Sequence, residues 1–199
     1  MPAFSIRPKE AEIIGRLLAG YGELEFIVYE CVKVALGRST IAARLLFRVR
    51  SEKTRLDIAD AILREVCDSY ELTVKYTEAI SAAHYCRKIR NQYAHCHWIG
   101  DESDGLFFAN IEPSAEKKSG EIILAFNHVD DALLARQEAF FANTQVYLWW
   151  LQHELRVRAG SLPSHNVPTP KQRPQPPLHN PPEEHPLPKR LKDNRKPEE

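Results

Sequence analysis

Residues 8–36 read PKEAEIIGRLLAGYGELEFIVYECVKVAL, and this stretch sets the fold class of the chain. Apolar residues recur in it at steps of three and four, which is typical of a helix with one buried face. The positions that show this period best are Ile14, Leu18, Tyr21, Val28 and Val32. Pro8 suits the first turn of a helix, and Gly37 suits the left-handed residue that ends one. The stretch therefore predicts one long helix, with the acid Glu25 on its apolar face.

Two further segments repeat this helical period. Residues 41–66 form the first, although the polar residues 51–54 weaken its middle. Residues 68–97 form the second, which begins with a pair of acids at capping-box spacing. On this segment Arg90 interrupts an otherwise apolar face. Both segments are predicted as helices that bury their apolar faces against the first.

The pattern changes after residue 98 and returns near residue 130. Residues 106–111 and 121–126 are rich in β-formers and flank a polar connection, which predicts a small β-hairpin. A last helix is predicted from Asn127 or Asp130 to about Arg158. Its broad apolar coverage fits packing in the core of its own chain, and the alternative is that it contacts a second subunit as well. The fold class that follows is all-α: an antiparallel four-helix bundle with a small β-hairpin inserted before the last helix.

The last part of the chain differs in composition from the rest. Residues 161–199 hold 11 of the 14 prolines and none of the aromatic residues. So few apolar side chains cannot offset the entropy that ordering the segment would cost. The sequence therefore predicts one helical domain over residues 1–160 and a disordered proline-rich tail over residues 161–199.

Charge and cysteine usage limit the class of protein. The 27 basic and 27 acidic residues cancel, which excludes strong attraction to nucleic acid or membrane through net charge. The longest apolar run, residues 146–151, is far shorter than the roughly twenty residues that a membrane-spanning helix needs. The N-terminus does not resemble a secretion signal, and the four cysteines show no paired spacing. These features predict a cytoplasmic protein with reduced thiols and no membrane association.

Residues 87–98 read RKIRNQYAHCHW and concentrate cations, imidazoles and an amide at the end of the third predicted helix. At helical spacing one polar stripe carries His84, Lys88, Asn91 and His95, beside the face that carries Arg90. Arg90 and Glu25 each place a charge on an apolar face, where an unpaired charge is costly. We therefore predict that these two residues form an ion pair that orients the guanidinium toward Asn91 and His95.

An oriented arginine beside a histidine suits the cleavage of RNA by transesterification. The reaction needs a base for the 2′-hydroxyl proton, an acid for the leaving 5′-oxygen and a fixed cation for the charged phosphorane. An imidazole, with an ordinary pKa of about 6.5, fills either protonation role near neutrality. One imidazole does not readily serve as acid and base at once, so two copies across a two-fold axis are favoured. The substrate would be single-stranded RNA, whose backbone is flexible enough for in-line attack.

The sequence Arg90-Asn91, three further residues and then His95, at the end of the third helix of a small bundle, resembles the signature of the HEPN superfamily (higher eukaryotes and prokaryotes nucleotide-binding). The resemblance covers about residues 8–158. It implies an all-helical homodimer and a metal-independent endoribonuclease of toxin–antitoxin, phage-defence or RNA-processing systems. It also implies that Arg90, Asn91 and His95 are catalytic and that both subunits contribute to one cleft.

Four other residues are predicted to support this site: Glu25, His84, Lys88 and His97. In toxins that nucleotidyltransferase antitoxins neutralise, a Tyr stands two residues after the motif His, where this chain has His97. This departure weakens that particular pairing and leaves a protein antitoxin or regulator of another kind as the expected partner. The superfamily also includes catalytically silent members. The alternative is therefore a non-catalytic helical module that binds nucleotide, RNA or a protein through the same cleft.

Other chemistries find little support in the sequence. The histidines and cysteines of residues 84–97 are not spaced as zinc ligands, because neighbouring positions on a helix point apart and no paired Cys spacing occurs. A glycine-rich phosphate loop and a Gly-x-Ser-x-Gly elbow are both missing. The sequence predicts no metal and no cofactor.

Overall fold

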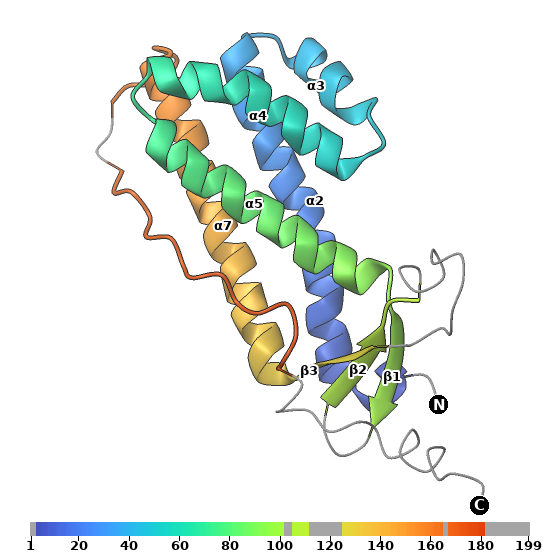
Figure 1. Ribbon diagram of the computed structural model, residues 1–199. Helices are drawn as coiled ribbons and strands as arrows, with labels where there is room; N and C mark the ends of the chain where they lie inside the picture. The colour runs from blue at the N-terminus through green and yellow to red at the C-terminus, as the bar shows by residue number, and fades with distance from the viewer. Residues whose placement is uncertain (1–2, 102–104, 112–124, 165–166, 182–199) are drawn as a thin grey trace, which may run out of the picture. The chain divides into compact units, whose positions relative to one another are not determined.

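The computed structural model describes residues 3–101, 105–111, 125–164 and 167–181 (Figure 1). This part of the chain is mostly helical and contains one small antiparallel sheet. The helices are α1 (Ala3–Ile6), α2 (Pro8–Leu36), α3 (Ser39–Phe47), α4 (Glu52–Ser69), α5 (Thr73–Ala94) and α7 (Asp131–Arg158). The strands are β1 (His97–Asp101), β2 (Gly105–Ala109) and β3 (Phe126–Val129). The predicted helical class with a β insertion before the last helix is thus confirmed at this level.

The chain divides into two compact units. Unit 1 consists of residues 1–18, 89–138 and 176–199, and unit 2 consists of residues 19–88 and 139–175. Helices α2, α5 and α7 each continue from one unit into the other. The division does not fall at residue 160, where the sequence predicts the end of the domain.

Unit 2 is a helical core built from apolar stripes. The positions Tyr21, Val28 and Val32 of the stripe predicted for α2 are all buried. Partners from the other helices of the unit are also buried, among them Ala59, Leu63, Tyr76, Ala83, Tyr147, Leu151 and Leu155. Each large apolar side chain in such a core stabilises the fold by about 1.5–3 kcal/mol. The 3.6-residue period of the sequence is therefore the cause of this part of the fold.

Local signals set where these helices begin and end. Gly37 ends α2 with a φ of 63°, as its sequence predicts. The single helical region expected over residues 41–66 is two helices, because the hydroxyl of Ser51 caps α4 by accepting a hydrogen bond from the Thr54 amide at 3.2 Å. Asp130 caps α7 in the same way, with its carboxylate 2.8 Å from the Leu133 amide. The predicted start of the last helix near Asp130 is confirmed.

Unit 1 contains the sheet, whose strand order is β1-β2-β3. Strand β1 pairs with β2 through His97 opposite Ala109, and β2 pairs with β3 through Leu106 opposite Val129. Gly105 begins β2 with a φ of 93°, and an added Cβ there would lie 2.8 Å from the Val129 carbonyl oxygen. Only glycine fits that position without strain.

The sheet corrects two expectations. Helix α5 ends at Ala94. His97 and Trp98, which the sequence places at the end of a helix, belong instead to β1, a strand in addition to the two that were predicted. Trp98 packs its ring against Phe108 across the strand pair, at a centroid distance of 5.3 Å, and this aromatic pairing favours strand over helix. The predicted strand over 106–111 is observed over Gly105–Ala109, and that over 121–126 falls largely outside the described residues.

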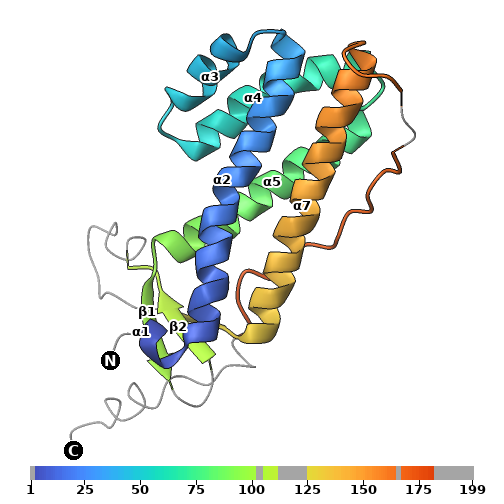
Figure 2. The ribbon, with the colours of Figure 1, turned by 180° about the vertical axis from the view of Figure 1, so that it is seen from behind.

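Helix α1 packs on strand β1 of the same unit, as Figure 2 shows from behind. The ring of Phe4 lies 5.4 Å from that of Trp98. A Cβ added at Gly100 would lie 2.9 Å from the Ala3 Cα, so β1 needs glycine where the two backbones approach. The short N-terminal helix is thereby held to the sheet.

Residues 167–181, which belong to the segment predicted as a disordered tail, form hydrogen bonds with the helices and with strand β3. The Val167 carbonyl accepts a hydrogen bond from the Trp150 indole at 3.3 Å, and the Lys171 carbonyl accepts one from the Asn143 amide at 3.0 Å. Asn180 is buried and forms a backbone bridge with His128. Proline-rich chain is extended and leaves its carbonyls without internal partners, so donors on the helices can fix it without large apolar burial. Residues 182–199 lie outside the described part.

The four cysteines and the lengths of the helices complete the description of the fold. The thiols are free; those of Cys31, Cys67 and Cys86 are buried, and that of Cys96 is half-buried. Across the described residues, none of the helices combines the length and the apolar character that crossing a membrane requires.

Candidate functional site at the end of helix α5

The residues predicted to be catalytic lie together in unit 1, at the C-terminal end of α5. Arg90 and Asn91 occupy the last turns of the helix, and His95 follows directly after its end. The backbone amide of His95 donates to the Asn91 carbonyl at 3.3 Å, which continues the helical hydrogen-bond pattern to the histidine. The imidazole is exposed, whereas Arg90 and Asn91 are half-buried. His95 is therefore in contact with solvent at the rim of a more enclosed arginine and amide.

Arg90 and Asn91 are joined by a side-chain hydrogen bond. Arg90 Nη1 donates to Asn91 Oδ1 at 3.1 Å. A guanidinium donates in a fixed planar arrangement, so a bond to a neighbouring amide restricts its orientation. Asn91 and His95 are four residues apart and share one side of the helix. Asn91 thus links the arginine to the side of the helix that carries the histidine.

His97 is the first residue of β1 and is exposed. It stands two residues after His95, beyond the point at which helix changes to strand. The sequence places both imidazoles on one helix, where positions two apart face different directions, but the change of backbone removes that restriction. Unit 1 therefore presents two exposed imidazoles, His95 and His97, two residues apart in the chain.

Glu25 lies in unit 2 and has a partner that the sequence analysis does not name. Its Oε1 atom lies 2.9 Å from Arg55 Nε, and the two side chains are only 15% and 19% exposed. Apolar side chains of Val28, Leu46 and Leu56 surround this ion pair. Because Arg90 belongs to the other unit, the predicted contact between Glu25 and Arg90 stays a prediction.

His84 and Lys88 also belong to unit 2, on the part of α5 that precedes the motif. Lys88 is exposed and His84 is half-buried. Burial, together with the nearby Arg87 guanidinium, lowers the pKa of His84 below the usual imidazole value. His84 therefore favours the neutral form. The support that these two residues were predicted to give the motif stays a prediction.

Two residues inside the motif have contacts that the sequence analysis misses. Gln92 donates to the Leu178 carbonyl at 2.8 Å, and the hydroxyl of Tyr93 bonds Gln137 Oε1. Gln137 is fully buried on α7. The sequence does carry a signal for the contact of Gln137. This polar residue stands four residues after Leu133, on the apolar side of its helix, and Glu25 is likewise a polar residue on the apolar side of α2. A polar residue at such a position requires a partner.

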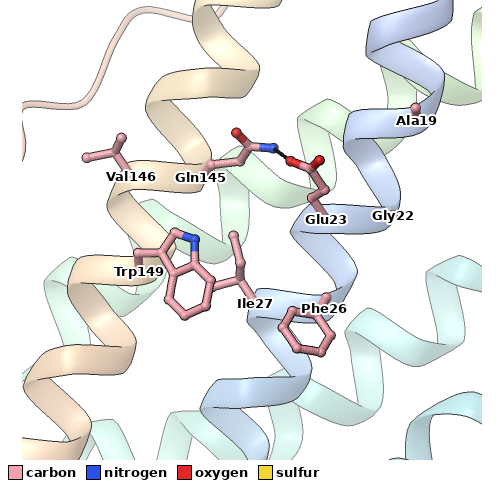
Figure 3. A pocket seen from close by; sticks show the side chains of 8 residues that line it. All are labelled: Ala19, Gly22, Glu23, Phe26, Ile27, Gln145, Val146 and Trp149. Carbon is pink, nitrogen blue, oxygen red and sulfur yellow. Dashed lines mark hydrogen bonds between the residues drawn. The ribbon is translucent and has the colours of Figure 1, made fainter.

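A groove lies elsewhere, between α2 and α7 in unit 2 (Figure 3). Its volume is about 520 Å³. Figure 3 shows the rings of Trp149 and Phe26 on either side of Ile27, with the 2.8 Å hydrogen bond from Gln145 to Glu23 above them. Apart from Glu23 and Gln145 this lining is apolar, and it holds none of the predicted site residues. Such a groove suits an apolar side chain rather than a phosphate.

Within the described ranges, no three His, Cys, Asp or Glu side chains gather so that they could hold a metal ion. The side chains of the motif at the end of α5 carry imidazole, guanidinium and amide groups.

No family model, no curated protein and no solved structure matches this chain. The functional conclusion consequently depends on the geometry of the site and on the resemblance of its motif.

Proposed function

We propose that the chain is a metal-independent endoribonuclease of HEPN type that cleaves single-stranded RNA by acid–base transesterification. The observation that carries the proposal is the arrangement of the motif at the end of α5: an exposed His95 follows, about one helical turn later, the hydrogen-bonded side chains of Arg90 and Asn91. The long helices are compatible with the antiparallel four-helix bundle that such an enzyme would have. The absence of paired cysteine spacing agrees with action in the cytoplasm.

Each residue of the motif has a distinct role in the proposed reaction. His95 takes the proton of the 2′-hydroxyl or gives one to the leaving 5′-oxygen, and its exposure lets it exchange that proton with water. Arg90 stabilises the charge that develops on the phosphorane. Asn91 orients the guanidinium through its Oδ1 atom. The products are a 2′,3′-cyclic phosphate and a 5′-hydroxyl, because the 2′-oxygen itself is the nucleophile.

The proposal includes a homodimer, because the reaction needs a base and an acid and each motif holds one histidine. Support comes from the exposed apolar side chains of unit 2, since Phe26, Val146 and Trp149 are about half exposed (50%, 56% and 46%). Large apolar residues that gather on a surface mark contact sites for other proteins. A defence or toxin–antitoxin role, with a protein regulator as further partner, is the context in which a dormant nuclease of this type would act.

The proposal is tested by incubating the purified protein with labelled single-stranded RNA in the presence of a chelator. The wild type is expected to cleave, and His95→Ala and Arg90→Ala are each expected to lose about a hundredfold or more in rate. An RNA with 2′-deoxyriboses should resist cleavage, and His153→Ala, which removes an imidazole of unit 2, should leave the rate unchanged. Activity that requires a metal, or that persists in His95→Ala, contradicts the mechanism.

The same assay shows whether two chains share the reaction. If one active site uses His95 of both subunits, an excess of His95→Ala chain should suppress wild-type activity far beyond simple dilution. If His97 is instead the second proton-transfer group within one chain, the excess has no such effect and His97→Ala is inactive. Sedimentation velocity on the same samples gives the oligomeric state.

A second function is favoured by one feature of the site. Arg90 is half-buried and bonded within its own chain. The end of α5 that carries the motif can therefore bind a phosphate without performing chemistry on it. The chain would then be a non-catalytic module for nucleotide, RNA or protein. Specific RNA binding without products, weakened by Arg90→Ala, supports this reading over the nuclease.

A further inference from the structure

Residues 176–181, Pro-Pro-Leu-His-Asn-Pro, form a segment that we call the C-terminal strap; it belongs to unit 1 together with the motif. Two glutamine side chains donate hydrogen bonds to carbonyls of the strap. Gln137 Nε2 donates to the carbonyls of Pro177 and Leu178, at 2.8 and 3.1 Å. Gln92 Nε2 donates to the same Leu178 carbonyl at 2.8 Å. Both glutamines therefore converge on two consecutive peptide groups.

The other end of the strap is fixed by Asn180. Its backbone amide donates to the His128 carbonyl at 2.8 Å. Its side-chain Nδ2 lies 3.0 Å from His128 Nδ1 and donates to Asp130 Oδ2, also at 3.0 Å. Both neighbours of that nitrogen accept, which fixes the orientation of the amide. Asn180 and His128 are buried. The strap is thus anchored to strand β3 and to the cap of helix α7.

These contacts lead directly into the motif. Gln92 and Tyr93 are the first two of the three residues between Asn91 and His95. Gln92 holds the strap itself, and Tyr93 bonds Gln137, which holds the strap from the opposite helix. The last turn of a helix has carbonyls without helical partners and tends to fray. External bonds on two consecutive side chains counteract that tendency where the motif lies.

We propose that the strap is a positioning element for the Arg90–Asn91–His95 site, with Gln92 and Gln137 as the residues through which it acts. This inference rests on the proposed function for its catalytic consequence. The strap bonds Gln92 directly, and it bonds Tyr93 through Gln137. It holds the backbone between Arg90 and His95, and small displacements of positioned groups cost catalysis heavily.

The test uses the full-length protein and the variant Gln92→Glu, which keeps the shape of the side chain but directs carboxylate oxygens at the Leu178 carbonyl. Asn180→Ala is a second variant that releases the strap without altering the motif. Amide hydrogen exchange, followed by mass spectrometry over residues 90–97, is expected to be about tenfold faster in both variants. Asn143→Ala is the matched control, because Asn143 bonds the tail at Lys171 and Arg173 in unit 2.

Kinetics on the same proteins give the second measurement. Gln92→Glu and Asn180→Ala should lower kcat for RNA cleavage about tenfold with little change in KM, since positioning acts on the reacting groups rather than on binding. Asn143→Ala should change neither kcat nor the exchange of residues 90–97. Unchanged exchange in both strap variants, or changed exchange with unchanged kcat, overturns the inference.

Failure of the proposed function gives a different result. A wild type that cleaves no RNA refutes the nuclease, while faster exchange in the two strap variants still shows that the strap orders the motif. If the wild type cleaves RNA and the strap variants match it in both measurements, the positioning role of the strap is refuted and the nuclease function is supported.

Discussion

The two compact units use different interactions to hold the same three long helices. Of the six polar residues that are buried among the described ones, four belong to unit 1: Glu10, His128, Gln137 and Asn180. Unit 2 has Thr144 and Gln152 and otherwise a core of aliphatic, aromatic and cysteine side chains. Apolar packing therefore dominates unit 2, and hydrogen bonds between distant segments give unit 1 much of its definition.

This difference shows what each kind of interaction can specify. Apolar burial scales with area and tolerates many partners, so it fixes which side of a helix faces inward. A buried amide tolerates only a partner of the right type in the right place. Gln137 accordingly selects a particular piece of the tail, the carbonyls of Pro177 and Leu178, rather than a general apolar surface.

Arg55→Ala should produce the largest loss of stability. It removes the guanidinium 2.9 Å from Glu25, a carboxylate that is only 15% exposed in unit 2. The expected loss in the free energy of unfolding is about 3 kcal/mol, measured by urea denaturation at neutral pH. The double variant Glu25→Leu, Arg55→Leu should regain most of it, since no charge is then buried. A single variant as stable as the wild type would show that the pair contributes little.

Gln137→Leu should have the next largest effect and tests the hydrogen-bonded unit. The substitution keeps the apolar volume but leaves the Tyr93 hydroxyl and the carbonyls of Pro177 and Leu178 without this partner. We expect a loss of about 2 kcal/mol, measured in the same denaturation experiment. Gln145→Leu is a suitable control, because its bond to Glu23 is exposed. Equal stability of Gln137→Leu and wild type would contradict the division between the units.

The smallest effect concerns pH and His84 in unit 2. Because burial lowers the pKa of this imidazole, the unfolded chain takes up the proton before the folded chain does. Stability should therefore fall as the pH drops through the ordinary imidazole range, and His84→Gln should remove part of that fall. Melting temperatures at about pH 7.5 and about pH 5.5 give the comparison. An identical pH dependence in the two proteins would show that His84 contributes nothing.

The parts of the fold that depend on period and capping could be predicted from the sequence. Helix α2 has the predicted bounds from Pro8 to Leu36, and Asp130 caps α7 as expected. The break between α3 and α4 could not be predicted from apolar period alone, because it follows from the cap at Ser51.

The candidate site was predictable only in part. The pattern of Arg90, Asn91 and His95 predicts the three residues at the end of one helix; Arg90 and Asn91 lie in the last turns of α5, and His95 follows directly after Ala94. The change to strand at His97 depends on cross-strand aromatic packing with β2, a contact between residues that no local period reveals. The contacts of residues 167–181 depend on donors such as Gln92, and the apolar content on which the prediction of disorder is based does not detect such donors.

The state of the four thiols has a practical consequence. Burial raises the pKa of Cys31, and it raises the pKa of Cys67, Cys86 and Cys96 to about 12. Alkylating reagents attack the thiolate, so the folded chain should react slowly with them near neutral pH. A cysteine introduced at an exposed position such as Ser161 would then take up a fluorophore selectively, with no need to replace the native cysteines first.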